Sequence, residues 1–134
     1  EAGIAFEIIP GVPSACAAAA AAGIPLTRRL TARRVQFFTG HDVTGQLPED
    51  MNLSALADPT ASTVVFMGKR TFPKLLAMLM AHGLPDDTPA ILAEGISTPT
   101  QHIERHTMRS LAGQLSQEIS DRPALILYGP LAEG

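Results

Sequence analysis

Residues 62–83, STVVFMGKRTFPKLLAMLMAHG, place a strand signal directly before a helix signal. The β-branched and apolar run after Ser62 is typical of a buried strand, and Gly68 ends it. Apolar side chains then recur at helical spacing, at Leu75, Leu76, Leu79 and Met80. Gly83 stands where a helix commonly ends, so the second half predicts an amphipathic helix over residues 72–82. A strand that leads into such a helix is the building unit of an α/β layer.

The same alternation runs through the rest of the chain. Further strands are expected at residues 6–9, 35–38, 90–94, 101–108 and 124–128, and further helices at residues 14–22, 53–57 and 110–119. Residues 101–108 follow residues 90–94 after a brief turn, which favours an antiparallel pair and a mixed sheet. The sequence therefore predicts a single α/β layered domain over residues 1–134, with a mixed, roughly five-stranded sheet flanked by helices.

Local signals mark the ends of two of these helices. Residues 14–22 are almost entirely alanine, the best helix former, and either Pro13 or Ser14 can start this helix. Gly23 stands where a terminal glycine belongs. Ser110 is a possible cap for the helix over residues 110–119.

Composition narrows the class of protein. The chain has 134 residues, of which 46% are hydrophobic and 17% charged, as in a globular domain with its own core. The apolar run over residues 14–26 is interrupted by Gly23 and Pro25 and is too short to span a bilayer, so no membrane association is expected. The net charge of -3 argues against a general nucleic-acid binder.

The number and spacing of cysteine and histidine residues limit which disulfides and metal sites the chain can form. The single Cys16 allows no internal disulfide and no cysteine-based metal site, which fits a reducing compartment and predicts a cytoplasmic protein. His82, His102 and His106 lack the spacing of a metal site, so no metal is expected. His102 and His106 alternate on the expected edge strand and are predicted to face solvent.

Two groups of polar residues have two interpretations each. Arg28, Arg29, Arg33 and Arg34 lie within seven residues, and they either bind a polyanion through their guanidinium groups or form a solvated charge run beside a helix. His41 follows a strand end, where α/β proteins place ligands. It either binds a carboxylate or moves a proton, or is a loop histidine without a task.

Two further segments follow strand ends and offer mostly backbone. Met67 and Gly68 end one strand, where the methionine either packs on a flat or thioether ligand or belongs to the core. Residues 94–99, EGISTP, follow another strand and either expose backbone groups to a ligand or form only a turn. Together with the turn at residues 10–14, such segments suit an enzyme that positions a reactive cofactor better than a hydrolase.

Taken in order, short motifs along the whole chain resemble the tetrapyrrole methylase family. The matching pieces are IPGVPSA (9–15), AGIPLTRR (22–29), FTGH (38–41), TVVFMG (63–68), TPA (88–90), STPTQ (97–101) and PALI (123–126). Each piece is short, but the ordered set is specific.

The resemblance implies the C-terminal domain of a two-domain, homodimeric methyltransferase whose N-terminal domain is not in this chain. The start without Met and the early strand-like run point to a fragment as well. The family binds S-adenosylmethionine between its two domains, mostly through backbone groups. The matching positions here are Pro13, Ser14, Met67, Ile96 and Ala124.

The resemblance also implies the reaction, which is the C-methylation of uroporphyrinogen III to precorrin-2 for sirohaem and cobalamin. Because the substrate carries many carboxylates, Arg28 and Arg29 are expected on the substrate side together with His41, which is the candidate for a base. The alternatives are a sibling methylase that acts on a later cobalamin precursor or on ribosomal RNA, and a non-catalytic dimerisation or docking fragment. The acidic balance weighs against RNA.

Three positions depart from the family pattern. Pro13 stands where Thr or Ser is usual, which removes a backbone donor and a hydroxyl. Ile96 replaces a smaller Ala or Gly and narrows the cavity, and Arg28 stands where His is common.

Overall fold

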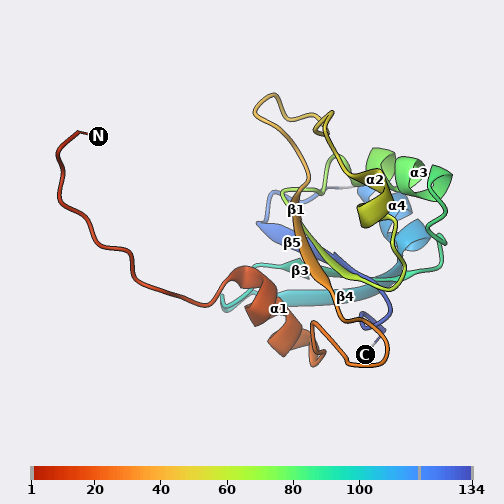
Figure 1. Ribbon diagram of the computed structural model, residues 1–134, viewed down its shortest axis with the longest axis horizontal. Helices are drawn as coiled ribbons and strands as arrows, with labels where there is room; N and C mark the ends of the chain where they lie inside the picture. Colours follow the sequence, from red (N-terminus) through yellow and green to blue (C-terminus); the bar gives the residue numbers. More distant parts are fainter. Residues whose placement is uncertain (1, 118, 134) are drawn as a thin grey trace.

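The computed structural model describes residues 2–117 and 119–133, and its body is a five-stranded sheet with the order β1-β2-β5-β3-β4 (Figure 1). The strands are β1 (Val35–Thr39), β2 (Ser62–Phe66), β3 (Pro89–Glu94), β4 (His102–Thr107) and β5 (Ala124–Tyr128). Strands β1 and β2 pair in parallel, and all other neighbours pair antiparallel. The expected mixed sheet and the antiparallel pairing of β3 with β4 are confirmed.

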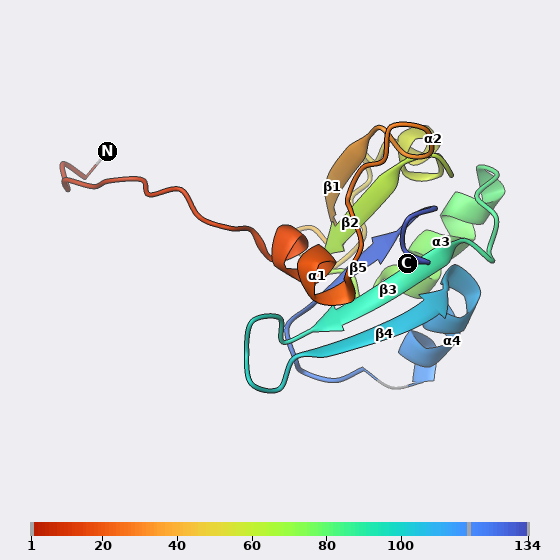
Figure 2. The same ribbon diagram turned by 90° about the horizontal axis from the view of Figure 1, so that it is seen from below.

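Helices cover both faces of this sheet. They are α1 (Ser14–Ala22), α2 (Leu53–Leu56), α3 (Phe72–Ala81) and α4 (Met108–Gln117). Figure 2 shows α1 on one side of the sheet and α3 and α4 on the other. The larger apolar cluster packs under α2, α3 and α4, and Phe72, Leu75 and Leu79 are fully buried in it. This arrangement leaves the loops at the strand ends free to form a site.

Helix α1 packs on the sheet through alanine alone. Ala15 and Ala18 are fully buried in one apolar cluster with Ile91 and Leu125. Gly23 ends the helix in the left-handed region, at φ 72°, as the sequence predicts. The alanine run therefore combines high helix propensity with burial on the sheet side of the helix.

The cap of α4 differs from the sequence prediction. The helix begins at Met108, so Thr107 occupies the cap position and Ser110 lies in the first turn. The Ser110 amide donates to Thr107 Oγ1 at 3.2 Å, and the Thr107 amide donates to Ser110 Oγ at 3.1 Å. Ser110 as the cap is therefore wrong, because the chain enters the helix directly from β4 and these two side chains satisfy the first amides reciprocally.

The expected strand over residues 6–9 is also wrong. The structure gives residues 2–13 no helix or strand, and Phe6 and Ile8 are 83% and 82% exposed. Figure 1 shows this segment running away from the body. Its apolar residues find no partner strand among the described residues, so hydrophobicity alone does not form a strand here.

None of the helices in the described ranges, 2–117 and 119–133, has the length and apolar character needed to cross a membrane.

Candidate functional site

The ends of four strands meet at one edge of the sheet. Because β1 is parallel to β2, Thr39 lies beside Phe66 at their carboxyl ends. Because β5 runs antiparallel to β2 and β3, its first residue, Ala124, pairs with Glu94 at the end of β3. The loops after β1, β2 and β3 and the loop before β5 therefore gather in one place, where α/β proteins commonly bind ligands.

A cavity of about 610 Å³, which we name the apolar cavity, opens at this edge. It is lined by Ser14, Phe66, Met67, Gly95, Ile96, Thr98, Thr100, Arg122, Pro123, Ala124 and Leu125. Four of the five residues that the sequence assigns to the cofactor lie in this lining. The fifth, Pro13, is the residue directly before α1 and adjoins Ser14. The fold thus brings together positions that are spread over most of the chain.

A second cavity of about 440 Å³, which we name the basic cavity, adjoins the first and shares Met67, Arg122, Pro123 and Ala124 with it. Its other lining residues are His41, Gly45, Lys69, Arg70, Ile119, Ser120 and Asp121. Arg70 and Arg122 outnumber the single carboxylate of Asp121, so this lining favours an anionic ligand.

The surroundings of His41 engage one ring nitrogen and leave Nε2 without a hydrogen-bond partner among the described residues. The nitrogen Nδ1 lies 2.9 Å from the backbone carbonyl of Asp42. The carboxylate of Asp42 is occupied elsewhere, since it accepts from the hydroxyl and amide of Thr44, and these hydrogen bonds hold its pKa below the usual range. Asp42 therefore positions its own loop, and its carboxylate does not orient the imidazole.

Backbone geometry around the two cavities is unusual. Met67 and Ser97 are the non-glycine residues with positive φ in the described part of the chain, at 53° and 65°. The turn at Met67 directs its side chain outward, where it is 55% exposed, so it does not belong to the core. Strained residues of this kind cluster at ligand sites.

Two glycines join the loops after β1 and β2. A Cβ on Gly40 would lie 2.5 Å from Gly68 Cα, so the two backbones touch where no side chain fits. The Gly40 amide donates to Phe66 O at 2.6 Å, and Thr71 Oγ1 donates to Gly40 O at 2.5 Å. This contact places His41 next to the Met67 turn.

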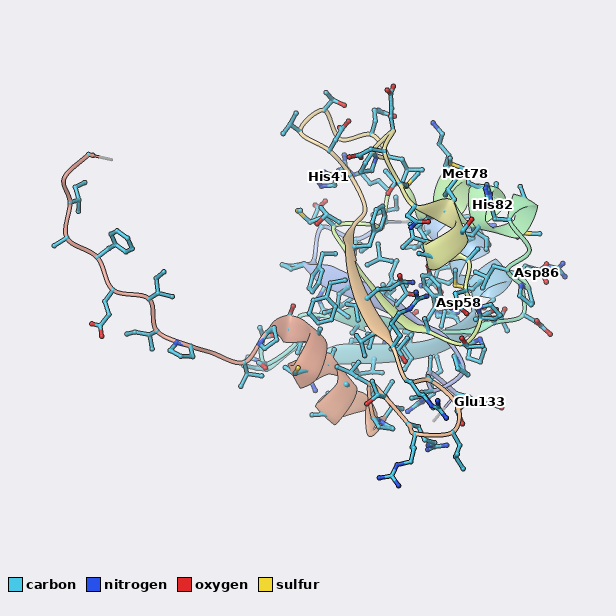
Figure 3. The ribbon with its side chains drawn as sticks, viewed as in Figure 1. His41, Asp58, Met78, His82, Asp86 and Glu133 are labelled. Atoms are coloured by element: carbon cyan, nitrogen blue, oxygen red, sulfur yellow. The ribbon has the colours of Figure 1, made fainter. Side chains whose placement is uncertain are left out.

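The predicted basic cluster lies elsewhere. Arg28, Arg29, Arg33 and Arg34 precede β1, whereas His41 follows it, so the strand separates them. Arg34 forms an ion pair with Asp58 at 2.8 Å, and Arg33 donates to Arg29 O at 2.6 Å. Figure 3 shows His41 in the upper part of the body and Glu133 in the lower part. Arg28 and Arg29 line neither cavity.

Sequence reasoning missed three basic residues that line the cavities. Lys69 and Arg70 come directly after the Met67-Gly68 turn, and that position beyond a strand end was the available signal. Arg122 carried no signal, because it lies in an ordinary-looking loop before β5. Its guanidinium donates to the Thr100 carbonyl and so connects two loops of the apolar cavity.

A larger depression of about 700 Å³ lies among Asp87, His106, Glu133 and neighbouring residues. It lies beside the start of β3 and the end of β4, away from the converging strand ends. It shares no lining residue with the apolar and basic cavities, so we place the candidate site at the latter two.

Comparison with known proteins identifies the family of this chain. The family model described as Tetrapyrrole (Corrin/Porphyrin) Methylases matches residues 1–112. The chain is 39% identical over 131 residues to the chloroplastic S-adenosyl-L-methionine-dependent uroporphyrinogen III methyltransferase of Arabidopsis thaliana. It is 40% identical over 133 residues to the siroheme synthase of Chromobacterium violaceum. These alignments cover 98% and 99% of the chain but only 36% and 28% of the two relatives.

Solved structures share the fold. A cobalt precorrin-4 methyltransferase of cobalamin biosynthesis superposes with a TM-score of 0.82 at 28% identity, over 96% of this chain and 53% of that one. The uroporphyrin-III C-methyl transferase of Thermus thermophilus, in complex with S-adenyl homocysteine, gives a TM-score of 0.78 at 27% identity, over 98% of this chain and 55% of that one. The chain thus spans about half of each.

Proposed function

Because this chain belongs to the tetrapyrrole methylase family, we propose that it is the C-terminal domain of a two-domain S-adenosylmethionine-dependent methyltransferase that converts uroporphyrinogen III to precorrin-2. The observation that carries the proposal is the apolar cavity, which collects Ser14, Met67, Ile96 and Ala124 at the converging strand ends. The chain covers only part of its relatives, so the missing share of the site is assigned to the rest of the full-length protein.

The apolar cavity fits a nucleoside-type ligand in size and chemistry. Its volume of about 610 Å³ lies within the usual range for small-molecule sites, roughly 300–1,000 Å³. Ser14 begins α1, and the amides of Ser14 and Ala15 precede the first hydrogen bonds of the helix, so they favour a carboxylate. The exposed thioether of Met67 and the side chain of Ile96 offer apolar contact. Pro13 has no amide, so we assign its contact to van der Waals packing.

When bound, S-adenosylmethionine supplies an activated methyl group on a sulfonium. The residues of this chain then need only to orient the methyl group toward the attacking carbon and to exclude water. The side chains of Met67 and Ala124 border both cavities, so they lie where the two reactants would meet. A reactive side chain at this boundary is not required.

The basic cavity is the proposed substrate side. Arg70 is exposed and forms a fork that matches carboxylates, and His41 lies in the same lining. His41 stays the candidate that accepts the departing proton. The substrate role predicted for Arg28 and Arg29 stays a prediction, because contact with this site would require another domain or a second protomer. We also propose a homodimer in a reducing compartment, in keeping with the single Cys16.

Calorimetric titration of the full-length protein with S-adenosylhomocysteine tests the cofactor assignment. We expect Met67→Ala to weaken binding about five- to tenfold, since losing half of a buried methionine contact costs about 1 kcal/mol. Met80→Ala is the matched control, because Met80 is similarly exposed, at 45%, but lies on α3 outside both cavities. The absence of binding by the unmodified protein, or equal effects of both variants, contradicts the proposal.

A sibling activity on a later cobalamin precursor is the second candidate, and the TM-score of 0.82 with the cobalt precorrin-4 methyltransferase favours it. A methyl-transfer assay with uroporphyrinogen III and with later methylated precursors separates the two. We expect turnover with uroporphyrinogen III, and exclusive turnover with a later precursor would replace our proposal with the sibling reaction.

A further inference from the structure

Lys69 lines the basic cavity, yet its charge is directed into the protein. The ammonium Nζ donates to Ser120 Oγ at 2.9 Å, to the Arg122 carbonyl at 2.9 Å and to Glu94 Oε2 at 3.3 Å. An ammonium group has three donors, and all three are used here. The Lys69 side chain is 11% exposed. Lys69 therefore has no donor left for a ligand, in contrast to the neighbouring exposed Arg70.

The acceptors of Lys69 come from different loops. Glu94 ends β3, while Ser120 and Arg122 lie in the loop before β5, and Lys69 itself follows the Met67 turn after β2. Ser120 Oγ also donates to Glu94 Oε2 at 2.5 Å, which closes the group. We name Lys69, Glu94 and Ser120 the loop clamp. Each of the three segments that it joins contributes lining residues to the cavities.

The position of Glu94 shows why the clamp is needed. Glu94 is the one buried residue that carries a charge in the part of the chain that the structure describes. A buried carboxylate is costly unless it is paired and hydrogen-bonded, and Lys69 and Ser120 supply both. The adjacent Gly95 amide donates to Pro123 O at 2.9 Å, so the end of β3 and the loop before β5 are held together at two successive positions.

We propose that Lys69 is a positioning residue that sets the width of the apolar cavity by holding these three loops together. This inference rests on the proposed function for its ligand, but the clamp itself is a property of the protein. Without Lys69, the segment that holds Ser120 and Arg122 loses its tie to Glu94 and loosens beside Met67, which leaves the Gly95–Pro123 hydrogen bond as the remaining link between this loop and the end of β3.

The test measures two quantities on the full-length protein, namely amide hydrogen exchange at Gly95 without ligand and affinity for S-adenosylhomocysteine. We expect Lys69→Met to accelerate Gly95 exchange and to weaken binding, each by about tenfold or more. Lys74→Met is the matched control, since Lys74 is an exposed lysine on α3 outside both cavities and should change neither quantity. Unchanged exchange and affinity in Lys69→Met overturn the proposal.

A double variant separates positioning from stability. Lys69→Met with Glu94→Gln leaves no unpaired buried charge, so thermal stability should return toward that of the unmodified protein. The Arg122 carbonyl still lacks its donor, so we expect binding to stay about tenfold weaker. Recovery of both stability and affinity would show that Lys69 only neutralises Glu94, and the proposal would then be wrong.

Two further outcomes are distinguishable. If Lys69→Met does not fold, Ser120→Ala tests the clamp, because it removes one exposed hydroxyl, and we expect about threefold faster exchange at Gly95. If the unmodified protein does not bind S-adenosylhomocysteine, the proposed function fails. The exchange measurement then still supports or overturns the clamp by itself.

Discussion

At the scale of single residues, the site depends on two positions that carry no side chain. Gly40 and Gly68 bring two backbones into contact, and that contact sets the place of His41 and Met67. A glycine at position 68 permits close backbone approach, and the backbone that approaches it belongs to another glycine of the same chain. Only the register of β1 with β2 brings these two positions together.

Replacing Gly40 by alanine tests this contact. The added Cβ would meet Gly68 Cα at 2.5 Å, so one of the two backbones must shift, and a shift of Gly40 would strain its hydrogen bond to Phe66 O. We expect Gly40→Ala to lower the free energy of unfolding by about 1–3 kcal/mol, as overpacking does. Chemical denaturation measures this loss. Gly113→Ala is the control, because a Cβ there meets nothing within 4 Å, and an equal loss in both variants would refute the contact.

At the scale of elements, β4 combines an edge of the sheet with a docking surface for α4. Glu104 on this strand accepts from His106 Nε2 at 2.9 Å, from Gln114 Nε2 at 2.8 Å and from His102 Nε2 at 3.0 Å. The prediction that both histidines face solvent holds for His102, whereas the side chain of His106 is only 15% exposed. Alternation along a strand assigns a face, but it does not show which helix covers that face.

These hydrogen bonds make the β4–α4 contact dependent on pH. They hold the pKa of the Glu104 carboxyl below its usual range, His106 contributing most, followed by Gln114 and His102. A carboxyl whose pKa is lowered by folding stabilises the fold fully at a pH above its pKa in the unfolded protein, about 4.3. This stabilisation is lost as the pH falls through its lower pKa in the folded protein. We therefore expect Glu104→Gln to be less stable than the unmodified protein at neutral pH.

Thermal unfolding between about pH 3 and pH 8 measures this effect, and the two melting curves should converge below about pH 4. Glu49→Gln is the control for a carboxylate on the exposed surface, and it should follow the unmodified protein throughout. A difference between Glu104→Gln and the unmodified protein that is the same at every pH would contradict the assignment to this carboxyl.

At the scale of the whole molecule, the segment over residues 2–13 stands apart from the body. Its apolar side chains, which include Ile4, Phe6, Ile8 and Ile9, are each at least three-quarters exposed. Exposed apolar runs of this kind commonly mark an interface. In the proposed two-domain protein this segment would lie between the two domains, and the other domain would cover its apolar side chains.

Limited proteolysis tests that placement. We expect chymotrypsin to cleave the isolated chain rapidly after Phe6 and to leave the body from α1 onward intact, because exposed segments without secondary structure are the preferred sites. In the full-length protein the same bond should be protected by about tenfold or more. Equal cleavage in both proteins would show that nothing covers this segment.

Much of the fold follows from the sequence by itself. Local periodicity predicts the strands and the amphipathic helix α3, the propensity of alanine predicts α1, and terminal glycines such as Gly23 mark where helices end. The ordered motifs indicate the family, and they name Ser14, Met67, Ile96 and Ala124 as positions of interest. Such features can be read locally, because each depends on neighbours within a few residues.

The tertiary structure decided what depends on distant partners. It left the apolar run at residues 6–9 without a strand, because a strand needs another strand to pair with. It separated Arg28 and Arg29 from His41 by placing them at opposite ends of β1. It also assembled the loop clamp, whose members are 25 or more residues apart in the chain. Long-range hydrogen bonds and burial arise only from the packed fold, and no local pattern encodes them.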